Sequence, residues 1–407
     1  MAIFKIKKVI FDQPEKSEKR KIKLISFISF LTGFSQAVII YVMSYYFKLA
    51  SGTENVSFFY TTTFVVVLIL LINLHKLVKK WGKSRVFLLT LLAKIGILFS
   101  LTLVEPSYWS IALLGLYLVF NSLEWTMIDV ILESFSRDRL SGRIRGLHLT
   151  VFNLGSLFGP FLSIKILAAA DFGGIFIFIL IINSLVLILT LLGLRKINHQ
   201  FSQKLGVREL IKKVLKRKNI LRIYYISFIL EFFYALMVIY TPLYLLDLGF
   251  SWEKIGVIFT FMLIPFVILQ YPAGILADKK IGEKELIIAA IVFMAVFTTA
   301  AYFTHSRSLF VWSLILFSTR IGAALIEILR DSYFYKRISG QDVDLINFFR
   351  TSMPLAYVTA TFLSGLVLIF LPIKVVFLIV AIFIFSALYP AFKLMDNPCE
   401  AELKDKL

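Results

Sequence analysis

The chain of 407 residues is 59% hydrophobic and only 17% charged, and it carries a formal net charge of +19 at pH 7. Soluble domains carry about 25% charged residues, so these apolar side chains exceed what one soluble core can bury and require lipid as a solvent. Lipid accepts only helices or closed barrels. The long apolar runs lack the alternation typical of barrel strands, so we predict an all-α membrane protein.

Twelve apolar runs follow a basic tail at residues 1–21, each close to the length of about 20 residues that crosses a bilayer. We place these runs at 22–47, 56–77, 85–104, 108–135, 144–168, 172–194, 220–246, 252–277, 285–303, 309–335, 343–370 and 374–394. They predict two six-helix bundles, at residues 22–195 and 220–395, and a second polar tail at 396–407.

A basic linker at residues 196–219 joins the two bundles. Val207, Leu210, Ile211 and Val214 share one helical face there, and cations occupy the other faces. This pattern predicts an amphipathic helix lying on anionic lipid. A solvated tether with some helix is the alternative interpretation.

Lysine and arginine are concentrated in the first tail, in the loops after the second and fourth runs, and in the linker. Because cytoplasmic loops carry an excess of these residues, we expect both termini in the cytoplasm and the protein in the cytoplasmic (inner) membrane. This distribution accounts for the net charge, so we expect no nucleic-acid partner.

Two loops repeat one another. Lys79-Lys80-Trp81-Gly82-Lys83 follows the second run, and the segment from Asp278 to Lys284, with Gly282, follows the eighth. Internal repeats of a six-helix half in a very apolar chain are typical of transporters whose site lies between the halves.

The segment Gly274-Ile275-Leu276-Ala277-Asp278-Lys279-Lys280-Ile281-Gly282-Glu283-Lys284 resembles the loop signature of the major facilitator superfamily, Gly-x-x-x-Asp-Arg/Lys-x-Gly-Arg/Lys-Arg/Lys. One extra residue precedes Gly282, and Glu283 replaces a cation. In the first copy Leu74 and Val78 replace the glycine and the aspartate. The resemblance covers nearly the whole chain.

The fifth run contains Gly146, Gly155 and Gly159-Pro160, a spacing similar to the motif that the drug:proton antiporters of this family carry there. A proline after glycine bends a helix, and glycines let a neighbouring helix pack closely. Ordinary small-residue packing is the alternative. Ser163-Ile164 replaces the family's trailing glycine pair.

The resemblance implies two bundles around a central cavity lined by the first, fourth, seventh and tenth helices, and transport by alternating access. It favours proton-coupled export of amphipathic or hydrophobic small molecules. The alternatives are a proton-coupled uptake symporter for a sugar or organic ion, and an uncoupled receptor or lipid scramblase. The chain lacks a Walker A pattern, a zinc-binding histidine pair and a nucleophile constellation. We therefore expect no enzyme activity and no cofactor. We also expect a monomer.

Ionisable groups within the runs are the candidate site, because each costs about 2.5 to 3.5 kcal/mol at the bilayer centre and needs a partner or water. The candidates for a substrate or proton cavity are Gln36, Asn121, Glu124, Glu231 and Arg320. Glu124 and Arg320 occupy near-equivalent places in the two halves and are expected to face each other. A structural pair of Glu124 with Lys94 is the alternative.

A second group lies toward the cytoplasmic ends of the fourth and tenth runs and their loops, where acids alternate with arginines. We expect a cytoplasmic gate formed by Asp129, Glu133, Asp278, Glu327, Arg330, Asp331 and Arg350. Paired acids there either pass protons or form a clamp with the arginines.

Overall fold

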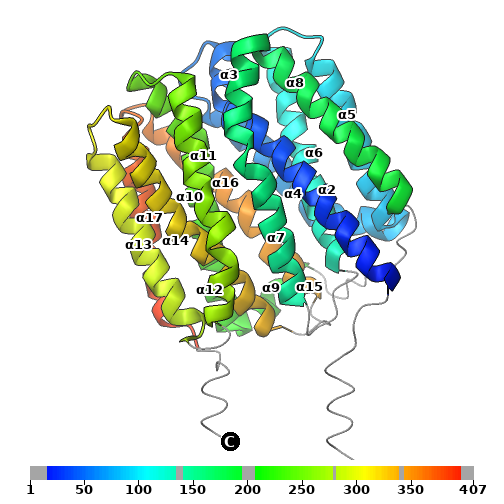
Figure 1. The fold of residues 1–407 in the computed structure, drawn as a ribbon. Helices are drawn as coiled ribbons and strands as arrows, with labels where there is room; N and C mark the ends of the chain where they lie inside the picture. The colour runs from blue at the N-terminus through cyan, green and yellow to red at the C-terminus, as the bar shows by residue number, and fades with distance from the viewer. Residues whose placement is uncertain (1–15, 134–140, 195–206, 278–280, 339–342, 396–407) are drawn as a thin grey trace, which may run out of the picture.

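The computed structural model describes residues 16–133, 141–194, 207–277, 281–338 and 343–395. Within these ranges the chain is helical and contains no strand (Figure 1). The first helix set is α2 (Lys16–Ile40), α3 (Met43–Ser51), α4 (Ser57–Trp81), α5 (Lys83–Leu101), α6 (Tyr108–Glu133), α7 (Ser141–Leu157) and α8 (Gly159–Gly193).

The second helix set follows α9 (Val207–Lys216). It consists of α10 (Lys218–Asp247), α11 (Trp252–Ile268), α12 (Gln270–Leu276), α13 (Glu283–Phe303), α14 (Leu309–Lys336), α15 (Val343–Arg350), α16 (Ser352–Val367), α17 (Val375–Ser386) and α18 (Leu388–Phe392).

Ten of the described stretches are long and apolar enough to cross a membrane. One of them, His148–Gly193, contains two crossings, because the backbone leaves the helical conformation at Ala170 and at Asp171, where φ is 50°. The pair α15 and α16 supplies one more crossing. The described helices therefore fit the predicted twelve crossings, and the prediction of an all-α membrane protein is confirmed.

Five crossings that the sequence predicts as single helices are interrupted. The breaks lie at Tyr41-Val42, Phe158, Leu269, Thr351 and Ala387. Pro160, Pro265, Pro354 and Pro390 lie within about a turn of the last four breaks. Because proline removes a backbone donor and clashes with the preceding turn, it explains why hydrophobicity alone predicted longer helices there.

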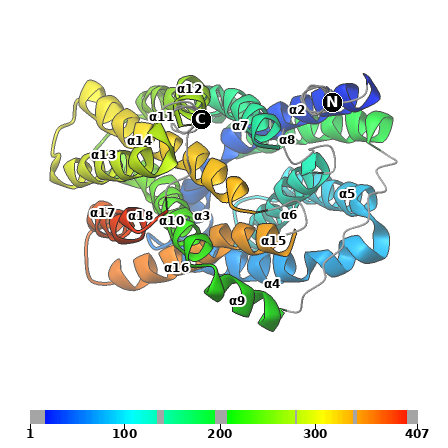
Figure 2. The ribbon, with the colours of Figure 1, turned by 90° about the horizontal axis from the view of Figure 1, so that it is seen from below.

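The two sets lie side by side (Figure 2). Contacts between them run along two seams, with α4 packed on α16, and α11 packed on α7 and α8. Both ends of the described chain lie at one end of the molecule (Figure 1), which we call the terminal end, and the opposite end is the distal end.

At the distal end the two sets are bonded to each other directly. Asn55 donates to the carbonyl of Gly365 at 3.0 Å, and Thr61 donates to Thr361 at 2.8 Å. Ser57 hydrogen-bonds the hydroxyl of Tyr240. These bonds hold the distal ends of the two sets together.

The glycines of the fifth crossing seat it against α2. A Cβ added at Gly155 would lie 2.2 Å from the carbonyl oxygen of Phe30, and one at Gly159 would lie 2.3 Å from the Cβ of Ala37. The backbones are therefore in direct contact, as the motif predicts. Gly146 lies in α7, in a part whose side-chain contacts the structure does not describe.

The linker contains a helix, α9, which packs on α10 and α15 at the terminal end. Its Val214 is buried, whereas its Leu215 is exposed. An amphipathic helix is thus present at 207–216, and its contact with lipid stays a prediction.

Candidate functional site

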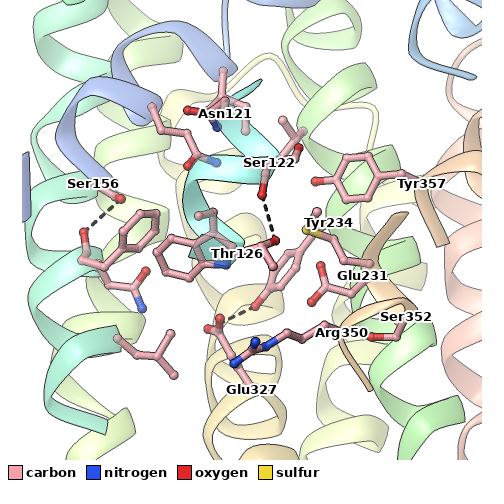
Figure 3. A pocket seen from close by; sticks show the side chains of 18 of the residues that line it. Asn121, Ser122, Thr126, Ser156, Glu231, Tyr234, Glu327, Arg350, Ser352 and Tyr357 are labelled. Carbon is pink, nitrogen blue, oxygen red and sulfur yellow. Dashed lines mark hydrogen bonds between the residues drawn. The ribbon is translucent and has the colours of Figure 1, made fainter. Parts of the chain in front are cut away.

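A cavity of about 320 Å³ lies between the two helix sets (Figure 3). Its walls come from α2, the break after α2, α4, α6 and α7 on one side, and from α10, α11 and α14 to α16 on the other. This size suits a small molecule, and a mixture of apolar walls and a few polar groups is typical of ligand sites. The predicted cavity residues Gln36, Asn121, Glu231 and Arg320 all line it.

Arg320 is a buried cation in the cavity wall. Its side chain is buried, with 2% of the residue exposed, and its Nη1 has no hydrogen-bond partner. Among the described residues it makes no ion pair, and its guanidinium carbon lies 4.7 Å from the ring centroid of Phe233. A ring face offsets only part of the cost of burying a cation, so Arg320 has room for an anionic partner.

The backbone of α14 fixes this orientation. A Cβ at Gly322 would lie 2.6 Å from the Cβ of Met294, so α14 packs tightly on α13 through that face. Arg320 lies two residues earlier, about 200° around the helix, and therefore faces the cavity.

Two tyrosine hydroxyls accompany Arg320. Tyr41, at the break after α2, and Tyr357, on α16, both line the cavity near the guanidinium. Neither hydroxyl makes a hydrogen bond with a residue that the structure describes. The three groups come from both helix sets and together offer several donors to one anion.

Toward the terminal end, Arg330 is compensated within the protein. It donates to Glu231 at 2.9 Å and to the hydroxyl of Ser227 at 2.9 Å, and Asp331 lies 3.5 Å from its Nε. Because the pair is partly buried and hydrogen-bonded, it links α14 to α10 within the second set.

Glu327, one turn before Asp331 on the same face of α14, has only neutral hydrogen-bond partners among the described residues. Its Oε2 accepts a hydrogen bond of 2.8 Å from Gln270 and a longer one of 3.5 Å from Tyr234. The close-up shows the Tyr234 contact as a dashed line (Figure 3). Gln270 in turn accepts from Asn153 of α7 at 3.2 Å.

The comparisons with known proteins agree with this architecture. The family model described as the Major Facilitator Superfamily matches residues 25–329 and 253–405. The chain belongs to the major facilitator superfamily. No curated protein matches the sequence.

Among solved structures, this major facilitator is similar to the human organic anion transporter MFSD10 (TETRAN). The TM-score is 0.72 at 15% identity, and the match covers 93% of this chain and 100% of the other. At that identity the likeness shows the fold, which agrees with the predicted major facilitator fold.

The expectation that Glu124 faces Arg320 is corrected by the structure. The carboxylate of Glu124 lies 2.5 Å from Nζ of Lys94, and both side chains are fully buried. Thr32 donates to the other carboxylate oxygen at 3.3 Å, and Asn121 accepts from Lys94 at 3.0 Å. Glu124 is absent from the cavity lining, because its ion pair with Lys94 of α5 holds its side chain inside the first set.

Four of the residues predicted as a cytoplasmic gate, Glu327, Arg330, Asp331 and Arg350, line the same cavity as Arg320. Their role as a gate stays a prediction. Asp129 and Glu133 lie on α6 with side chains that the structure does not describe, and Asp278 lies outside the described residues. The site therefore extends from Arg320 toward the terminal end as one continuous wall.

Sequence reasoning missed the uncharged polar residues of this site. Tyr41, Tyr357 and Asn153 line the cavity, and Gln270 donates a hydrogen bond to Glu327 without lining the cavity itself. A search for charges within apolar runs does not find these four residues. Gln270 has a usable signal, since it is a lone amide in an apolar run five residues after Pro265. A polar group at a helix break can bond the freed backbone or another helix.

Proposed function

We propose that this major facilitator carries amphipathic organic anions through the cavity by alternating access. The observation that supports this proposal most is Arg320, a buried cation in the cavity wall without a counter-ion among the described residues. An unpaired charge inside a membrane protein costs several kcal/mol. An anion that binds there removes that cost, so anions are selected over neutral and cationic molecules of the same shape.

The rest of the wall suits the apolar part of such a molecule. Aromatic and aliphatic side chains face the cavity beside the charged groups, among them Ile40, Phe64, Trp125, Phe152 and Phe266. A ligand with an aromatic or alkyl body and one acidic group would fill both parts. The organic anion named for the structurally similar transporter is consistent with this class.

We further propose export driven by proton exchange. The support is the fifth crossing, where Gly155 and Gly159 seat α7 and α8 against α2 in the pattern carried by the family's drug:proton antiporters. An uptake symporter for an organic ion would use the same cavity. Proteoliposomes with an imposed proton gradient separate the two, because an antiporter moves the anion against the direction of proton flow and a symporter moves it along.

The binding part is tested by thermal unfolding of the purified protein with three matched probes. Naphthylacetate carries an anion, naphthylacetamide is neutral, and naphthylethylamine is a cation. We expect naphthylacetate, or the sulfonate of the same ring, to raise the unfolding temperature by mass action. The amide and the amine should leave that temperature unchanged.

Arg320→Gln should weaken naphthylacetate binding about 10- to 100-fold, the value of one charged hydrogen bond of about 1.5–3 kcal/mol. Arg307→Gln is the matched control, because Arg307 is exposed in a distal loop. Equal stabilisation by the amide, or unchanged anion binding in Arg320→Gln, would contradict the proposal.

A further inference from the structure

Glu327 differs from Glu231 and Asp331, the other acids of the cavity wall, which both pair with Arg330. Glu231 is paired with Arg330 at 2.9 Å, whereas Glu327 has no ion pair with a residue that the structure describes. A carboxylate without a counter-ion binds a proton at lower cost, because no ion pair has to be broken. Glu327 is therefore the acid of this wall best placed to exchange a proton.

The charged or titratable groups around Glu327 are Arg330 and Asp331 on its own helix, and Glu231 and Tyr234 on α10. His148 of α7 and Arg350 of α15 line the same cavity. The described residues of α11, α12 and α13 contribute no charged side chain to the cavity wall. Arg330 is committed to Glu231 and Ser227, so Glu327 relies on Gln270.

Gln270 connects Glu327 to the other helix set. The side chain is almost fully buried, with 1% of the residue exposed, and it uses both ends of its amide. Its Nε2 donates to Glu327, and its Oε1 accepts from Nδ2 of Asn153. Because Asn153 lies on α7 and Gln270 on α12, this three-residue chain crosses between the sets.

We propose that Glu327 is a proton-binding site whose charge state is transmitted through Gln270 to Asn153, so that proton uptake loosens the contact between α7 and α12. A hydrogen bond to an ionised carboxylate is about twice as strong as a neutral one. The ionised form therefore holds the amide of Gln270 with its oxygen toward Asn153. Protonation weakens that hold, and the amide is then free to turn away from Asn153.

This inference rests on the transport role proposed above, since it couples the cavity to protons, yet its test requires no substrate. Leu154 and Tyr271 are exposed neighbours of Asn153 and Gln270. Spin labels on Leu154→Cys and Tyr271→Cys, in a chain whose single cysteine is replaced by Cys399→Ser, report the separation of α7 and α12 by electron paramagnetic resonance.

We expect the label distance to lengthen from alkaline to acidic buffer. Glu327→Gln should give the long distance in both buffers, because the amide mimics the neutral acid. Asn153→Ala should also abolish the pH response, although the proton site is intact. Glu253→Gln, which neutralises an exposed acid at the start of α11 outside the cavity, is the control and should keep the response.

A distance that does not change with pH in the unsubstituted background would overturn the inference, as would a response that survives in Glu327→Gln. A response lost only in Glu231→Gln would also overturn it and place the proton site at the Arg330 pair. The result is independent of anion binding, because Arg320→Gln should keep the full pH response. Failure of one proposal is therefore distinguishable from failure of the other.

Discussion

Two buried cations in this chain meet opposite surroundings. Lys94 is surrounded by Glu124 at 2.5 Å, Asn121 at 3.0 Å and the ring of Tyr117 at 5.5 Å. Arg320 has the ring of Phe233 and nearby tyrosine hydroxyls, and it makes no ion pair with a residue that the structure describes. Partners within the first helix set thus offset the free-energy cost of burying the lysine. The corresponding cost for the arginine is not offset by a described residue, and an anionic ligand in the cavity could offset it.

At the residue scale we predict that Glu124 is needed for stability and not for ligand binding. Glu124→Ala leaves Lys94 buried without its counter-ion, which typically costs about 3–5 kcal/mol. Thermal unfolding in detergent should show a large loss of stability. Replacing both partners together, as in Lys94→Leu with Glu124→Leu, should recover most of it, because the uncompensated charge is gone.

A double-mutant cycle supplies the control for this prediction. Glu124 and Lys94 should show strong coupling in stability, and Glu124 and Arg320 should show none, since additivity holds for residues without shared contacts. Strong coupling to Arg320 would contradict the placement of Glu124 inside the first set.

At the scale of elements, three of the interrupted crossings place a polar residue at the cavity or next to it. Tyr41 at the first break and Ser352 after the break between α15 and α16 line the cavity, and Gln270 after the break between α11 and α12 bonds Glu327, which lines it. Non-helical backbone within a membrane protein is tolerated where it is buried in protein or lines a cavity. The breaks thus place polar groups and points of bending at the same positions.

The close approach of α7 to α2 gives the next prediction. Gly155→Ala places a Cβ against the backbone oxygen of Phe30, which cannot move away alone, and overpacking of this kind costs about 1–3 kcal/mol. We expect a lower unfolding temperature. Gly96→Ala in α5 is the matched control, because nothing lies within 4 Å of its added Cβ.

Pro160→Ala should act differently from Gly155→Ala. It adds a backbone donor at the start of α8 and favours a continuous helix through Phe158. We expect normal insertion and naphthylacetate binding but slower proteoliposome transport of the same anion, because the bend between α7 and α8 sets the motion. Unchanged transport in this variant would remove the support that the fifth crossing gives to the antiporter proposal.

At the scale of the whole molecule, three hydrogen bonds between the two sets lie together at the distal end. Asn55, Ser57 and Thr61 of the first set bond Gly365, Tyr240 and Thr361 of the second. These contacts must break if the distal end is to open. Alternating access by rocking of one bundle against the other requires that opening.

We predict that a disulfide across this seam stops transport without stopping binding. Thr61→Cys and Thr361→Cys replace two hydroxyls that lie 2.8 Å apart. Oxidation in a Cys399→Ser background should abolish proteoliposome uptake of naphthylacetate, and reduction should restore it. Binding measured by thermal unfolding should persist in both states, because the cavity wall is unchanged.

The sequence by itself determined the architecture of this protein. The helical class and the two sets were predicted from apolar runs of bilayer length, from the repeated loops at Gly82 and Gly282, and from the basic linker. A run of about 20 apolar side chains without alternation crosses lipid as a helix, because a helix satisfies its own backbone hydrogen bonds. The sequence also identified Gln36, Asn121, Glu231 and Arg320 as cavity residues. Isolated polar groups in such runs avoid lipid, so they face the interior of the bundle or a cavity.

Only the tertiary structure decided how the polar groups are paired. Glu124 forms an ion pair with Lys94 rather than with Arg320. Glu327 accepts hydrogen bonds from Gln270 and Tyr234 and forms no ion pair with a described arginine. Pairing depends on the rotation of each helix about its axis and on small shifts at breaks such as Leu269. Those quantities are set by packing against neighbouring helices, which the order of residues along one helix does not contain.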